Sequence, residues 1–122
     1  MINEFSTYLN EELFKACDSV IRKIIVDATE NSAIIEFSVE GPDGWINIEI
    51  QMEYILEYQI KYRAPHDLDV MSGGIEYEIF DGKHFLDFCV YSGSGEGITK
   101  YRSSLLYFAC KNFVYCIKEY SE

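Results

Sequence analysis

Apolar and polar side chains alternate through residues 45–62. All nine even-numbered positions are apolar or aromatic, and seven of the nine odd-numbered positions are polar. Successive side chains of a β-strand point to opposite faces of the sheet, so this run predicts a strand with one buried side and one solvent-facing side. As one strand it would span roughly 60 Å. A helix over residues 51–63 is the alternative, because Met52, Leu56 and Ile60 partly fit a helical stripe.

Two hairpins accompany this run. Residues 33–40 alternate in the same way and lead into a Gly-Pro-Asp-Gly turn, so they are expected to pair antiparallel with the start of the long strand. Residues 75–80 and 83–91 form a second pair of predicted strands around Asp81-Gly82, which is typical of a two-residue hairpin turn.

Helical spacing marks the two ends of the chain. Apolar residues recur every three or four positions over residues 3–23 and again over residues 99–120. A strand at residues 113–117 is the alternative for the second segment. The sequence therefore predicts a single α+β domain over residues 1–122, in which an antiparallel β-sheet meander has an N-terminal and a C-terminal helix packed on one face.

The chain is strongly acidic. It has 122 residues and a formal net charge of −11, and residues 24–60 contain eight Asp or Glu and no Lys or Arg. This balance argues against nucleic acid and against anionic membrane surfaces as partners. It favours a cationic protein, although solubility alone is an alternative explanation.

The polar face of the predicted sheet collects many of these acids. Like charges on neighbouring strands repel each other, and a cationic partner would relieve that repulsion. Trp45 adds an aromatic side chain of the kind that anchors interfaces. The predicted partner-binding residues are Trp45, Glu36, Glu40, Glu49, Glu53, Glu57, Glu76, Glu78 and Asp87.

No set of residues for catalysis, metal binding or a cofactor stands out. His66, Asp67 and Asp69 lack a residue elsewhere that completes a metal or acid–base site, and no nucleophile motif surrounds Cys89. The four cysteines form no CxxC pair, and the N-terminus has no signal-peptide pattern. We therefore expect a cytoplasmic protein that is not an enzyme and that needs no cofactor.

In its size, its acidity and its acid-only segment 24–60, the chain resembles the small immunity proteins of interbacterial toxin systems such as contact-dependent inhibition. The resemblance is one of composition. It implies an inhibitor that binds a cationic toxin domain, often a nuclease, and occludes its active site. A homodimer is left open.

The order of elements is also similar to that of type III secretion chaperones, provided that residues 51–63 form a helix. Their pattern is α-β-β-β-α-β-β-α, and residues 73–108 then resemble their last hairpin and final helix. This second resemblance implies a dimer that binds an extended client segment. A small-ligand-binding or enzymatic domain is the third alternative.

Overall fold

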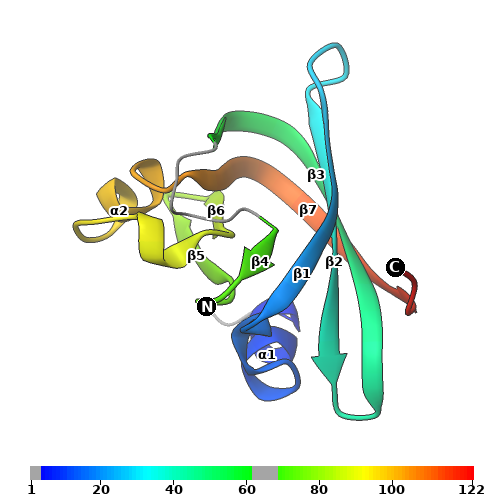
Figure 1. Ribbon diagram of the computed structural model, residues 1–122. Coiled ribbons are helices and arrows are strands. Elements are labelled where there is room, and N and C mark those ends of the chain that lie inside the picture. The colour runs from blue at the N-terminus through cyan, green and yellow to red at the C-terminus, as the bar shows by residue number, and fades with distance from the viewer. Residues whose placement is uncertain (1–3, 62–68) are drawn as a thin grey trace.

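Seven strands form one antiparallel sheet in the computed structural model, which describes residues 4–61 and 69–122. Their order across the sheet is β4-β1-β2-β3-β7-β6-β5, and the sheet curls into an open half-barrel (Figure 1). The elements are α1 (Glu4–Glu11), η1 (Phe14–Ala16, a 3₁₀ turn), β1 (Ser19–Asp27), β2 (Ser32–Gly41), β3 (Gly44–Ile60), β4 (Val70–Met71), β5 (Glu76–Phe80), β6 (Lys83–Asp87), η2 (Val90–Ser92, a 3₁₀ turn), α2 (Ile98–Arg102) and β7 (Leu106–Glu119).

The antiparallel sheet of an α+β domain is confirmed, but the predicted meander is interrupted. β1, β2 and β3 are neighbours in chain order, whereas β7 lies between β3 and β6 although it is the last strand of the chain. Both predicted hairpins are present, β2 with β3 and β5 with β6. The second hairpin is shorter than expected, because β6 ends at Asp87.

β3 is one long strand, as the alternation predicts up to Ile60, and Tyr62 lies outside the described residues. It pairs with β2 on one side and with β7 on the other. Tyr54 has a φ of 53°, and a β-bulge follows between Ile55 and Glu57, so the strand bends with the curled sheet. The alternative helix over residues 51–63 is wrong in its described part, and with it the element order of the secretion chaperones.

The helix predicted over residues 3–23 is wrong beyond Glu11. α1 ends there, η1 follows, and β1 begins at Ser19. Four residues between α1 and β1 have positive φ, a conformation that ends a right-handed helix and turns the chain. The β-branched residues of β1 then favour a strand, which pairs with β2.

The helix predicted over residues 99–120 is wrong beyond Arg102. α2 is short, and Leu106–Glu119 forms β7, so the alternative of a strand at residues 113–117 is confirmed. β7 is rich in aromatic and β-branched side chains, which favour strands. It pairs with β3 over most of the length of both strands, and the predicted C-terminal helix on one face of the sheet does not exist.

The main core joins α1 to the sheet. Phe5 of α1 packs edge-on against Tyr77, Phe113 and Tyr115, with ring centroids 5.2–5.7 Å apart. A second, smaller cluster joins Tyr101 of α2 to β6 and β7. The two clusters fix α1 and α2 on the sheet, and they leave the loops and hairpin ends exposed to solvent.

Candidate binding surface

Four of the eight acids predicted to form one bare surface, Glu36, Glu49, Glu57 and Glu76, lie next to cations instead. Lys118 of β7 contacts two of them, with its Nζ 2.9 Å from Oε1 of Glu36 and 3.1 Å from Oε2 of Glu49. Lys23 of β1 lies 3.8 Å from the same Glu36 oxygen. The strands on either side of β2 and β3 therefore supply the cations that the acid-only segment lacks.

Glu36 belongs to a largely buried hydrogen-bond network. Asn47 donates from Nδ2 to Oε2 of Glu36 at 3.0 Å, and Ser38 donates to Oδ1 of Asn47 at 2.7 Å. The bond from Lys118 holds the pKa of the Glu36 carboxyl below its usual range, against the opposing effect of burial. This carboxylate stabilises the sheet and is not available to a partner.

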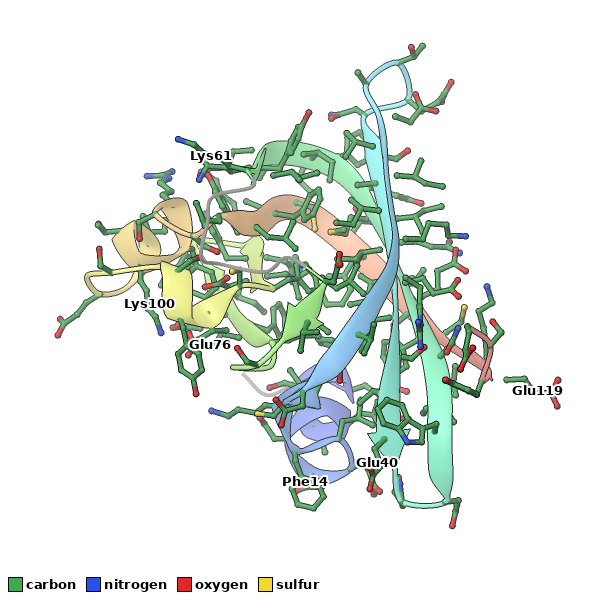
Figure 2. The ribbon with its side chains drawn as sticks, viewed as in Figure 1. Phe14, Glu40, Lys61, Glu76, Lys100 and Glu119 are labelled. Carbon is green, nitrogen blue, oxygen red and sulfur yellow. The ribbon has the colours of Figure 1, made fainter. Side chains whose placement is uncertain are left out.

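Three further predicted acids are also engaged. Arg102 forms a two-pronged ion pair with Glu57, with distances of 2.7 and 3.0 Å, and this contact lowers the pKa of Glu57. Lys100 contacts Glu76 at 2.9 Å, and Figure 2 shows these two side chains together. Glu78 accepts a hydrogen bond of 3.2 Å from the hydroxyl of Tyr101.

Asp87 is not a surface residue, which corrects its predicted role. Its side chain is fully buried. Oδ1 accepts hydrogen bonds from Ser104 Oγ at 2.6 Å and from the backbone N–H of Cys89 at 2.9 Å. Oδ2 has no hydrogen-bond partner within the described chain, and burial raises the pKa of this carboxyl.

The remaining predicted residues separate into two places. Glu53 is exposed on β3, where Asn112 donates a long hydrogen bond of 3.4 Å to it. Glu40 and Trp45 lie opposite each other at the β2–β3 hairpin, and both are exposed. Glu40 and Trp45 line a recess in the surface that also contains further acids.

That recess, called the acidic groove here, lies between the end of α1 with η1 and the β2–β3 hairpin, and has a volume of about 520 Å³. It contains four exposed carboxylates, for which no ion pair occurs within residues 4–61 and 69–122. Its lining residues are Glu11, Glu12, Leu13, Phe14, Cys17, Asp18, Glu40, Gly41, Pro42 and Trp45.

Two aromatic rings stand in the acidic groove with large exposed areas. The exposed fraction is 77% for Phe14 and 45% for Trp45. Figure 2 shows the side chains of Phe14 and Glu40 near each other at the lower end of the molecule. Exposed aromatic rings flanked by carboxylates suit a Lys or Arg side chain, whose cation can pair with a carboxylate while its stem covers a ring.

A strained backbone holds Phe14 in this position. Phe14, Lys15 and Ala16 have φ values of 49°, 59° and 61°, in the left-handed region that side chains with a Cβ disfavour. The buried side chains of Leu13 and Ala16 anchor the segment, and the carbonyl of Lys15 accepts a 2.7 Å hydrogen bond from the N–H of Ile75. Backbone strain of this kind is typical of functional sites.

Sequence reasoning missed Phe14, Glu11, Glu12 and Asp18 as part of a site. An uninterrupted helix over residues 3–23 would place Glu11, Phe14 and Asp18 on one face, but it gives no reason to expect that face beside the β2–β3 hairpin, where the left-handed turn at η1 places these residues. The exposed position of Phe14 has no sequence signal, since an aromatic residue shortly after two glutamates also fits a buried helix face.

Two other kinds of feature, a metal centre and a membrane-spanning helix, are absent from the described residues. In the described ranges, no group of three or more His, Cys, Asp or Glu side chains is placed to hold a metal ion, and residues 66–68 of the His-Asp-Leu-Asp segment lie outside those ranges. No helix of the described chain is long and apolar enough to cross a membrane. Comparison with protein-family models, with curated proteins and with solved structures gives no match.

Proposed function

We propose that this protein is a binding module for a cationic protein and that the partner docks in the acidic groove. The observation that carries the proposal is the combination of four exposed carboxylates that make no ion pair in the described chain with two exposed aromatic rings. Most of the other predicted acids contact cations of the same chain, so the acidic groove is where negative charge and desolvatable aromatic area coincide.

Binding proceeds from long-range attraction to local contacts. A net charge of −11 accelerates the approach of a basic protein. In the complex, Lys or Arg side chains of the partner pair with Glu11, Glu12, Asp18 and Glu40. Phe14 and Trp45 then supply the area that is removed from water, which is where interfaces concentrate their binding energy.

The class of function that fits best is inhibition of a cationic toxin, as in immunity proteins. A toxin that acts on nucleic acid needs cationic residues to contact phosphates. An acidic groove that pairs with those same residues would occlude the active site, and the inhibitor would need no catalytic residue or cofactor of its own.

The proposal is tested with two variants of equal charge. Glu12→Lys with Glu40→Lys changes the acidic groove, whereas Glu30→Lys with Glu96→Lys changes two exposed acids outside it. Both variants raise the net charge by the same amount, so a difference between them reports position and not total charge. Proteins captured by each variant and by the wild type from a lysate of the encoding organism are identified by mass spectrometry, with elution in steps of salt.

We expect the wild type and the control variant to retain the same basic protein at low salt, and the groove variant to bind it with an affinity at least about tenfold weaker. Salt should release the partner, because screening weakens attraction between exposed charges. Equal retention by both charge variants, or a partner that is not basic, would refute the proposal.

A further inference from the structure

The second half of β7 is an open edge of the sheet. β6 pairs with β7 only at residues 107–110, whereas β3 pairs with every residue of β7 except Lys111. Residues 111–119 therefore have a strand partner on one side at most. In the described chain, no backbone hydrogen bond joins this stretch to any other segment than β3. The outward-facing backbone N–H and C=O groups of this stretch, about nine residues long, can therefore pair with another strand.

The charged side chains that protect an exposed strand occur only at the two ends of this edge, at Lys111, Lys118 and Glu119. Val114 is 62% exposed and Ile117 is 54% exposed, and neither Pro nor an inward-pointing charge interrupts the stretch. An apolar groove of about 560 Å³ runs beside it, between β7, His84 and the start of α1. An edge of this length and character is expected to be covered by a strand.

We propose that the covering strand is the same edge of a second copy, so that two sheets join through antiparallel pairing of residues 111–119 about a two-fold axis at Tyr115. In this register Lys111 of each copy lies opposite Glu119 of the other. Phe113 lies opposite Ile117, and Val114 lies opposite Cys116.

The sequence of the edge selects this register. A two-fold axis perpendicular to the sheet keeps the apolar face of both copies on the same side. The alternative registers are therefore those in which directly opposite side chains still lie on the same face of the sheet. An axis at Val114 places Lys111 opposite Ile117, and an axis at Cys116 places Phe113 opposite Glu119. Only pairing about Tyr115 brings unlike charges together at both ends and apolar side chains together between them.

The charges at the two ends are free to make these contacts. Lys111 lies over the ring of Tyr54, with its Nζ 5.8 Å from the ring centroid, and makes no ion pair in the described chain. Glu119 likewise has no ion pair there, and Figure 2 shows its side chain pointing away from the fold. Lys118, in contrast, is held by Glu36 and Glu49 on the sheet.

Net charge opposes this dimer at long range. Each copy carries −11, and screening of that repulsion strengthens association as the salt concentration rises. Binding of a cationic partner has the opposite salt dependence, so the two associations are distinguishable and the dimer does not rest on the proposed function.

The first test is a charge swap measured by sedimentation velocity over a range of protein concentrations. We expect a dimer for the wild type, a dimer affinity about tenfold or more weaker for Lys111→Glu and for Glu119→Lys, and recovery of the dimer in the double variant, where opposite charges again face each other. Lys61→Glu is the matched control, because Lys61 lies at the far end of the molecule from Glu119 (Figure 2) and should leave the dimer unchanged.

The second test reads the register directly. Directly opposite residues of antiparallel strands have Cβ atoms about 4.5–5.5 Å apart, so Val114→Cys should form an intermolecular disulfide with Cys116 of the other copy under mild oxidation. The exposed Cys17 is replaced by Ser in this background, and Val114→Ser is the control. A monomeric wild type, a dimer that Lys111→Glu leaves intact, or the absence of a cross-link between the thiol introduced at position 114 and Cys116 would overturn the proposal.

Discussion

Lys118 Nζ lies 2.9 Å from Oε1 of Glu36, so that the last strand of the chain neutralises a largely buried carboxylate on β2. The contact passes over β3, whose Glu49 shares the same ammonium group at 3.1 Å. Three strands are thereby joined by one cation, which comes from the far end of the sequence.

Replacement of Lys118 by Met should therefore destabilise the protein in a pH-dependent way. The pKa of Glu36 is lowered in the folded state, so the stability that the contact contributes is present above the unfolded pKa and is lost as the pH falls through the folded pKa. We expect a lower urea midpoint for the variant at about pH 7 and a difference from the wild type that shrinks as the pH falls below about 4. Lys61→Met serves as the control, and a pH-independent difference would contradict this role.

Asp87 should give the opposite pH dependence. Burial raises the pKa of its carboxyl, so the folded state binds a proton more tightly than the unfolded state, and stability falls as the pH rises through the window between the unfolded and folded pKa values. Asp87→Asn keeps an acceptor for Ser104 and removes the charge. We expect the variant to be more stable than the wild type by about 1–2 kcal/mol at about pH 8 and to lack that slope in its free energy of unfolding. Equal slopes for the two proteins would refute a buried titrating Asp87.

Gly74 should be essential for the turn that presents Phe14. Its φ is +76°, and a Cβ at this position would collide with the carbonyl oxygen of Lys15. Gly82 has a similar φ of +78° and open space around it, so Gly82→Ala measures backbone strain alone. We expect Gly82→Ala to lower the free energy of unfolding by about 1 kcal/mol and Gly74→Ala by about 3 kcal/mol or more. Urea unfolding measures both values. Similar losses of unfolding free energy for the two variants would show that a small backbone shift relieves the collision at Gly74.

Phe14→Asn should improve stability while it weakens partner binding. Asn tolerates the left-handed conformation better than Phe, and the Phe14 ring contributes little to the core because it is largely exposed. We expect a gain of about 1 kcal/mol in the free energy of unfolding together with loss of affinity for the captured basic protein. The exposed Tyr91 supplies a control, since Tyr91→Asn should leave affinity unchanged. Unchanged binding by the Phe14 variant would remove this ring from the interface.

The sequence predicts the long strand and its hairpins well, because these rest on local signals. Alternation along residues 45–60 and the Gly-Pro-Asp-Gly and Asp81-Gly82 turns require no knowledge of distant partners. The bulge after Tyr54 has no comparable signal. It depends on the pairing of β3 with β7, and it leaves Leu56, Tyr58 and Ile60 exposed although the alternation predicts all three as buried.

The two ends of the chain are predicted wrongly because short apolar runs fit a helix and a strand equally well. Assigning residues 99–120 to a helix also conceals the neighbours of the acids. Arg102 and Lys118 reach Glu57, Glu36 and Glu49 only because β7 lies beside β3. Three of the eight acids in segment 24–60 thus contact cations from elsewhere in the chain.

The indole signal of Trp45 reports directly whether the partner docks in the acidic groove. Trp45 is the one tryptophan of the chain and lines the acidic groove, so its indole N–H gives a single assigned signal in a ¹⁵N–¹H spectrum of the labelled protein. On titration with the unlabelled basic protein identified by capture, we predict that this signal shifts or broadens together with the amides of Glu11, Glu12 and Phe14. A saturated complex in which the Trp45 indole and these amides keep their free positions would contradict binding in the acidic groove.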